Sequence, residues 1–317
     1  MSAGGSGSLF GWLPGSVGDW LVPLHEGAHG APVPGRPVDA LAAIVPAGFP
    51  ALIRVLSPFR RVRPEDQRAE AVSWAATAAA LGTTLDPVPL SWRVMGASEY
   101  GGNSDVLGED GWYYSEPTEG QNDPATLARI ADVLALHTST PDQGAAAVWE
   151  GFSGLTSSQG VGFFFATAEW RPVSRLRHRL LSAREHLRRF GIRSAVLELV
   201  APSLPKPRGT GILGREAVAG QRLELPDRRY ICFSAGVASF AAETWPERAP
   251  WVDPRRIDAD APLTPNLIWP DDRAWVLVSE IDLNSTLIAC SRECADALLS
   301  APGLEASEIT RDTRLWG

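Results

Sequence analysis

The sequence predicts an α+β fold with a mixed, mainly antiparallel sheet and packed helices. Short segments of alternating apolar and polar residues, separated by turn residues, predict the strands, and N-cap residues followed by helical spacing predict the helices. The clearest pattern is a strand, strand, helix, strand unit at the C-terminal end, between Trp275 and Ile309. At 317 residues, 44% of them hydrophobic, the chain is long enough to bury a sizeable core.

The first predicted elements lie between residues 38 and 95. We expect a short helix over Val38–Ile44 and a strand over Ala51–Leu56. Pro64, followed by two acidic residues, is typical of a helix start and predicts a helix that runs to Ala80. Alternation over Leu90–Met95 predicts another strand.

The middle of the chain carries a long polar segment and several predicted elements. Gly101–Asn122 is expected to be a loop, interrupted by Trp112 and Tyr113, and loops of this length are often functional. Asp123 and Pro124 supply an N-cap and a first-turn proline for a helix to His137. Beyond it we predict strands over 145–150, 161–169 and 195–200, an amphipathic helix over 174–190, a linker over 202–214, and short strands over 223–225 and 230–234.

The C-terminal unit has the most specific local signals. Residues 275–282 alternate as a strand that places Glu280 and Asp282 on one face. A second strand is predicted over Thr286–Cys290, and Ser291 is the predicted N-cap of a helix over Arg292–Ser300. Leu304–Ile309 is expected to return as a third extended segment.

The domain prediction is one composite domain. Residues 1–20 are expected to form a flexible tail and residues 21–317 a single α+β domain, with a subdomain break near 201–220 as the alternative. The sequence leaves open whether 1–200 and 221–317 are separate domains.

Charge and composition exclude several functional classes. The formal charge of −8 and the pI near 5.2 argue against binding to nucleic acid and to an anionic membrane surface. No apolar run approaches the ~20 residues of a membrane-spanning helix. Three cysteines cannot all pair within one chain, and no signal peptide is visible, so we predict a cytoplasmic protein.

A literal H-E-x-x-H motif suggests a metal site. His25, Glu26 and His29 match the pattern in which two histidines one helical turn apart bind zinc and the glutamate activates water. Pro23 before the motif and glycine and proline directly after it disfavour the helix that this chemistry needs. We therefore favour no metal, and keep a metal-dependent hydrolase as the alternative function.

No cofactor is predicted. The segment Gly209–Gly214 spells G-x-G-x-x-G, but no strand precedes it directly and no helix of sufficient length follows it.

Carboxylates and one cysteine are further candidates for chemistry. Glu280 and Asp282, with Glu150 at the end of another strand, resemble the carboxylates of acid/base catalysis or metal binding. The alternative is that they mark the wet face of a sheet. Cys294 lies at a predicted helix N-terminus, where the pKa of a thiol falls; a buried, inert cysteine is the alternative.

The most asymmetric charge distribution lies in residues 171–193, which contain the helix predicted over 174–190. Between Arg171 and Arg193 there are eight arginines and one acid, Glu185. Arginine forks match carboxylate and phosphate geometry, so we predict a non-catalytic binding protein that meets an acidic partner or ligand through this helix and the 101–122 loop. A solvated outer face is the other interpretation. The candidate binding residues are Arg175, Arg177, Arg184, Arg188, Arg189, Trp112 and Tyr113.

Six blocks of sequence carry a resemblance to known proteins: Ile44–Phe49, Val72–Ala76, Ala147–Phe152, Leu225–Tyr230, Trp269–Trp275 and Glu280–Thr286. They resemble a family of uncharacterised actinobacterial proteins. The similarity is spread over most of residues 41–312, and the family carries no established activity. The resemblance therefore implies a bacterial, intracellular protein with a single fold, and it transfers no catalytic residue. The partner's identity and the oligomeric state stay open.

Overall fold

A computed structural model of the chain describes residues 10–25, 41, 44–65, 69–97, 105–152, 154–156, 211–225, 228–253 and 262–315. The chain divides into two compact units. Unit 1 comprises residues 1–150 and 219–317, and unit 2 comprises residues 151–218, so unit 2 is an insertion in the sequence of unit 1. Helices and mainly antiparallel sheets together make the fold α+β, as predicted.

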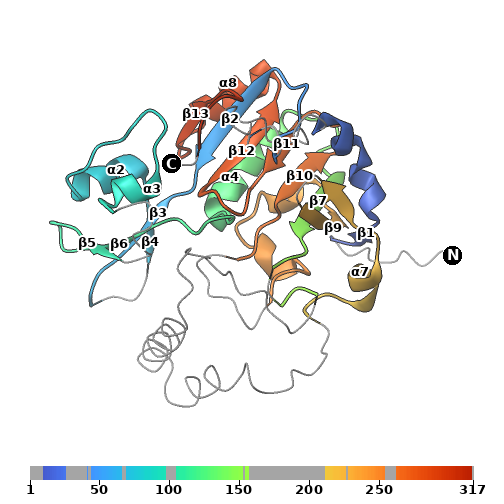
Figure 1. Cartoon of the computed structure of the whole chain (residues 1–317), viewed down its shortest axis with the longest axis horizontal. Coiled ribbons are helices and arrows are strands. Elements are labelled where there is room, and N and C mark those ends of the chain that lie inside the picture. The colour runs from blue at the N-terminus through green and yellow to red at the C-terminus, as the bar shows by residue number, and fades with distance from the viewer. Residues whose placement is uncertain are drawn as a thin grey trace, which may run out of the picture. The chain divides into compact units, whose positions relative to one another are not determined.

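A nine-stranded sheet forms the centre of unit 1 (Figure 1). Its strand order is β1-β9-β7-β10-β11-β12-β2-β13, with β8 also paired to β9, and every pair is antiparallel. The strands are β1 (Trp12–Leu13), β2 (Ala51–Leu56), β7 (Gly144–Trp149), β8 (Leu223–Leu225), β9 (Arg228–Ser234), β10 (Leu267–Pro270), β11 (Val276–Val278), β12 (Ser285–Cys290) and β13 (Ala306–Glu308).

A second, four-stranded sheet follows directly from β2. Its order is β4-β3-β6-β5, formed by β3 (Phe59–Val62), β4 (Glu70–Val72), β5 (Val106–Leu107) and β6 (Tyr113–Ser115). Phe59, Val72 and Tyr114 pack with Trp74 of α2 (Trp74–Ala80) and Val94 of α3 (Ser91–Val94) in one apolar cluster. This sheet therefore has its own small core.

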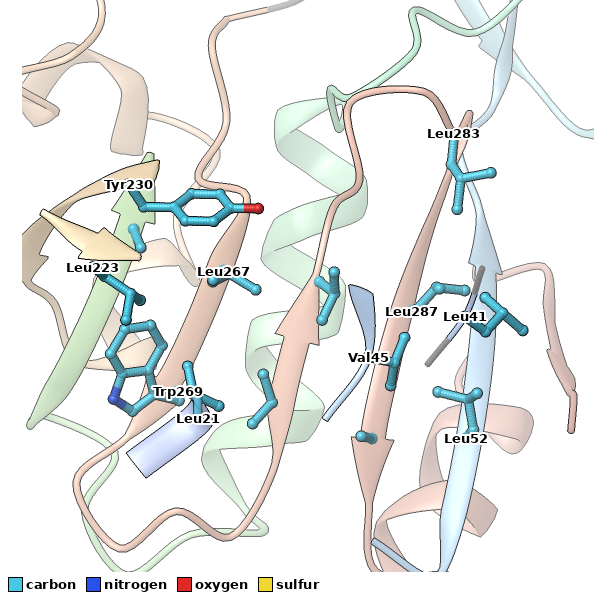
Figure 2. Packing of buried hydrophobic residues seen from close by; sticks show 14 of the residues in the cluster. Leu21, Leu41, Val45, Leu52, Leu223, Tyr230, Leu267, Trp269, Leu283 and Leu287 are labelled. Atoms are coloured by element: carbon cyan, nitrogen blue, oxygen red, sulfur yellow. The ribbon is translucent and has the colours of Figure 1, made fainter. Parts of the chain in front are cut away.

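One face of the large sheet carries the main apolar cluster (Figure 2). Alternate strand residues point to the same side, so Leu52 of β2, Leu287 of β12 and Leu267 of β10 fall in one layer. Leu21, from the 3₁₀ helix η1 (Gly15–Leu24), packs in the same cluster, as do Leu41 and Val45.

Two helices of unit 1, α4 and α8, have capped N-termini. In α4 (Pro124–Ala135), Asp123 accepts a hydrogen bond from the Thr126 N–H at 2.8 Å, and α4 lies behind the strands in Figure 2. In α8 (Arg292–Ser300), Ser291 accepts from the Cys294 N–H at 3.2 Å. The predicted caps of both helices are confirmed.

The predicted tail over 1–20 is wrong from Phe10 onward. Residues 12–13 form β1 beside β9, and residues 15–24 form η1. Phe10 is buried, with its ring 5.5 Å from that of Phe240 and 5.2 Å from that of Trp251. Aromatic residues that are distant in sequence thus pack against Phe10 and position a segment whose sequence is Gly-rich and irregular.

The predicted helix over 64–80 is wrong in its first half. Residues 70–72 form β4, and the helix begins only at Trp74, after the N-cap Ser73. The Glu305 carboxylate accepts hydrogen bonds from the N–H groups of Trp74 at 2.7 Å and Ala75 at 3.3 Å. The start of this helix is therefore supported by a residue far away in sequence.

Two predicted strands and one predicted loop also differ from the structure. Residues 91–94 form α3, because short apolar runs fit either period. β11 ends at Val278, and a turn closed by the Leu283 N–H to the Glu280 carbonyl (3.0 Å) follows it. The loop over 101–122 contains β5 and β6.

A buried polar network joins β12, the connection between β2 and β3, and the segment after β11. The Asn122 amide donates to Ser279 Oγ at 2.9 Å and accepts from Thr286 Oγ1 at 2.8 Å and from Ser57 Oγ at 3.4 Å. All four side chains are buried. Each amide atom of Asn122 therefore has a partner in a different segment of unit 1.

Of unit 2, the structure describes residues 151–152, 154–156 and 211–218. The Ile212 N–H donates to the Gly154 carbonyl at 2.9 Å, and α7 (Arg215–Ala219) begins shortly after it. Across the described residues of the whole chain, no helix has both the length and the apolar character needed to cross a membrane.

We expect Gly120→Ala to destabilise the protein far more than Gly111→Ala. Both glycines have positive φ, +70° and +81°, but a Cβ on Gly120 would lie 2.7 Å from Ile281 Cα, whereas one on Gly111 meets no atom within 4 Å. The expected losses in unfolding free energy are about 3 kcal/mol and about 1 kcal/mol. Urea denaturation measures both, and equal losses would contradict the described packing.

Candidate functional site

Six charged residues gather at one end of the large sheet. β7 and β11 end there and β9 begins there, because β7 is antiparallel to β9 and β10, and β10 is antiparallel to β11. We call these residues the charged cluster: Glu150, Arg222, Arg228, Arg229, Glu280 and Asp282.

Glu150 is held by two arginines at the point where the chain leaves unit 1. Its Oε2 accepts from Arg222 Nε at 2.9 Å, and its Oε1 forms an ion pair with Arg229. The Glu150 N–H also donates to the Arg229 carbonyl at 3.0 Å. Unit 2 begins at the next residue, 151, and ends at 218, shortly before Arg222. The Glu150–Arg222 pair therefore ties together the two connections to the insertion.

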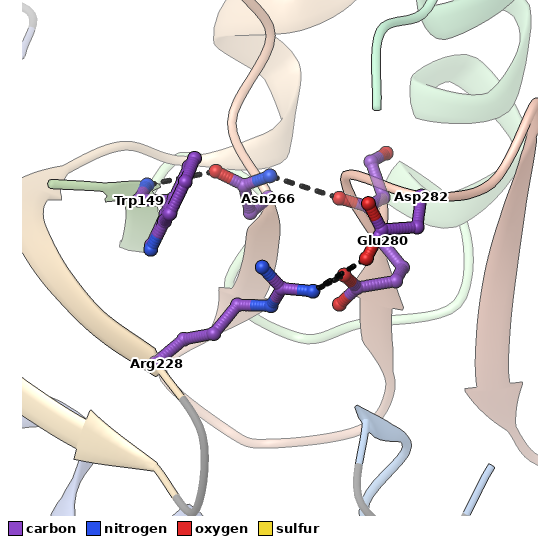
Figure 3. Close-up of polar contacts among 6 residues, drawn as sticks. Trp149, Arg228, Asn266, Glu280 and Asp282 are labelled. Atoms are coloured by element: carbon purple, nitrogen blue, oxygen red, sulfur yellow. Dashed lines mark hydrogen bonds and ion pairs between the residues drawn. The ribbon is translucent and has the colours of Figure 1, made fainter. Parts of the chain in front are cut away.

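Arg228 bridges the other two carboxylates (Figure 3). Its Nη2 lies 2.9 Å from Asp282 Oδ2 and also forms an ion pair with Glu280 Oε1, without the alignment of a hydrogen bond. Glu280 is 3% exposed. Burial raises the pKa of Glu280, the positive charge of Arg228 opposes this shift, and the negative charge of Asp282 adds to it.

Backbone and amide contacts fix the position of this bridge. Asn266 accepts from the Trp149 N–H at 2.7 Å and donates to the Ser279 carbonyl at 3.0 Å, so it links the ends of β7 and β11 (Figure 3). The Arg228 guanidinium carbon lies 5.5 Å from the centre of the Trp149 ring, within cation–π range. The guanidinium is thus held by an aromatic ring as well as by two carboxylates.

The predicted carboxylates come together, but with arginine partners that the sequence analysis did not name. Glu280 and Asp282 lie in the turn after β11 rather than on one face of a strand. Each carboxylate of the charged cluster is paired with a guanidinium, which favours a structural, charge-neutralised role over proton transfer. The pair Arg228 and Arg229, directly before the strand predicted over 230–234, was the sequence feature that could have indicated these partners.

The H-E-x-x-H motif begins where η1 ends. His25 follows Leu24, the last residue of this 3₁₀ helix, and Glu26 and His29 lie outside the described residues. His25 is buried, and its Nδ1 lies 2.7 Å from the Leu21 carbonyl. Among the residues that the structure describes, no group of three or more His, Cys, Asp or Glu side chains is arranged to hold a metal ion.

Trp112 and Tyr113 lie at the start of β6. The guanidinium carbons of Arg61 and Arg63 lie 4.3 and 4.6 Å from the centre of the Trp112 ring, and Tyr113 is exposed. The candidate arginines of the predicted helix, Arg175, Arg177, Arg184, Arg188 and Arg189, lie outside the described residues.

All three cysteines are free and buried. Cys294 occupies the first turn of α8, as predicted, but the pKa of its thiol is raised, chiefly by a hydrogen bond with Cys290 and also by burial. This environment is that of an inert cysteine rather than a reactive one.

Comparison with known proteins gives no match to any family model, curated protein or solved structure. The functional argument therefore rests on the residues of this chain.

We expect Arg228→Met to lower the free energy of unfolding by about 3–5 kcal/mol, because it leaves the buried Glu280 carboxylate without a cation. Adding Glu280→Gln should restore part of this loss. Asp282→Asn is the matched control, with an expected cost of about 0–1 kcal/mol, because the Asp282 side chain is 54% exposed. Urea denaturation of the four proteins measures these values, and an Arg228→Met variant as stable as the parent would refute the structural role.

The stability of the protein should fall as the pH drops below about 6.5, the ordinary pKa of histidine. Burial lowers the pKa of His25, hydrogen bonds with the backbone of Leu21 and Ile44 oppose this shift, and the charge of Arg311 adds to it. The unfolded chain then binds a proton that the folded chain excludes, so stability rises with pH up to 6.5 and is lost below it. His25→Asn should remove this slope while keeping a donor to the Leu21 carbonyl. Denaturation between pH 5 and 8 is the measurement, with His137→Asn as the control that retains the slope.

Proposed function

We propose that the chain is a non-catalytic binding protein that engages an acidic partner through the arginine-rich segment 171–193. The observation that carries this proposal is the charge of that segment: eight arginines and one acid in a chain whose formal net charge is −8. Such an asymmetry favours acidic surfaces, and arginine forks pair well with carboxylates.

The division of the chain supports the same proposal. The whole segment lies in unit 2, a compact insertion, while the sheet and the charged cluster belong to unit 1. We also propose a cytoplasmic location, in keeping with three free cysteines.

The described part of unit 1 offers little support for a small-molecule enzyme. The carboxylates of the charged cluster are paired with arginines. Two cavities in the described part of unit 1 measure about 110 and 260 Å³. Small-molecule sites usually measure about 300–1,000 Å³. The metal-dependent hydrolase gains no support from His25, which lies at the end of a 3₁₀ helix.

The test is binding of the full chain to fluorescein-labelled poly-L-glutamate, measured by anisotropy at low and at physiological ionic strength. We expect salt-sensitive binding that weakens about tenfold or more when Arg184, Arg188 and Arg189 are changed to Glu.

The matched control reverses three exposed arginines of unit 1, Arg129, Arg248 and Arg314, which changes the net charge by the same amount. This control should bind almost as tightly as the parent. Equal weakening in both variants would reduce the effect to net charge and overturn the proposal, as would the absence of binding by the parent.

A further inference from the structure

Strand β2, which lies between β12 and the edge strand β13, carries a buried arginine. Arg54 is 1% exposed and pairs across the strands with Leu287 of β12 and with Ser307 of β13. Arginine is almost never fully buried unless it is paired with an acid. We therefore expect a negatively charged partner for Arg54.

The described contacts of Arg54 include no acid. Its Nε donates to Ser285 Oγ at 3.0 Å, and its Nη1 is buried without a hydrogen-bond partner. Within the described ranges, no Asp or Glu lies at ion-pair distance from Arg54. One edge of the guanidinium is thus satisfied by a neutral hydroxyl and the other has a free donor.

Two acids near Ser307, the residue opposite Arg54, have partners other than Arg54. Glu305 accepts from the N–H groups of Trp74 and Ala75 at the start of α2. Glu308 forms an ion pair with Arg292 of α8. Neither therefore supplies the counter-charge, although both flank Ser307, the residue opposite Arg54.

A buried cation without a counter-charge is unfavourable, because it loses its hydration and gains no Coulomb attraction. Burial lowers the pKa of Arg54 to about 10, and the guanidinium is still charged at neutral pH. A bound anion would supply both the missing charge and the missing acceptor.

We propose that Arg54 and Ser285 form a binding site for a small carboxylate ion. The guanidinium presents its Nη1 donor to a planar carboxylate, the best match to the arginine fork. The Ser285 hydroxyl, which accepts from Nε, keeps its own proton to donate to the ligand.

The surroundings limit the ligand to a short aliphatic acid. By register, Leu52 and Leu287 lie beside Arg54 on the same face of the sheet, and both belong to the apolar cluster. Arg54 is almost closed to solvent, which limits the proposed ligand to a carboxylate of about the size of acetate. A carboxylate on the surface of a partner protein does not reach a side chain that is 1% exposed.

The test uses the full chain, dialysed into an acetate-free sulfonate buffer, with acetate as the probe. Thermal unfolding is followed as sodium acetate is added, and sodium gluconate at equal ionic strength is the control anion, too bulky for the site. We expect a saturable rise in Tm with acetate only, as for a ligand that binds the native state. An equal response to both salts would overturn the proposal.

Variants of the two residues separate a ligand site from a structural role. Arg54→Leu should unfold at a higher temperature than the parent without acetate, because it removes an uncompensated charge, and should show no response to acetate. The exposed control Arg129→Leu should respond like the parent. An acetate response that persists in Arg54→Leu would overturn the proposal.

Ser285→Ala keeps the test decisive if Arg54→Leu does not fold. Loss of one hydrogen bond should weaken acetate binding about fivefold, as measured by isothermal titration calorimetry. Unchanged affinity in Ser285→Ala would exclude Ser285 from the site and overturn the assignment.

Discussion

The hydrogen-bond network of Asn122 is the constraint on which the rest of unit 1 depends. Its amide joins β12, the end of β11 and the exit of β2 through Thr286, Ser279 and Ser57. The next residue, Asp123, caps α4. Because a buried amide without partners is costly, the network permits one register of these segments and excludes shifted ones. The same contacts position the turn that carries Glu280 and Asp282.

The charged cluster shows how an acidic chain tolerates carboxylates inside its fold. Glu280 is almost fully buried, and Arg228 lies against both it and the Trp149 ring. Replacing water by a fixed guanidinium offsets part of the desolvation cost of the carboxylate. The pairing also joins β9 to the turn after β11, two segments that share no hydrogen-bonded edge in the sheet.

Local signals predicted the parts of the fold that local interactions decide. The caps Asp123 and Ser291 fix two helices through contacts three residues away, so their spacing is visible in the sequence. The start of α2 was missed because Glu305 supports it from another part of the chain. For the same reason the sequence showed the carboxylates of the site but not their partner Arg228, which pairing of distant strands brings to them.

The Glu150–Arg222 pair has a consequence for how this architecture can diversify. Since unit 1 fixes both connections to residues 151–218 by its own strand pairing and this ion pair, the insertion is attached at two neighbouring anchor points. Sequence and length between such anchors can change at little entropic cost to the scaffold. Unit 2 can therefore be replaced by another sequence, in evolution or by design, while the nine-stranded sheet is kept.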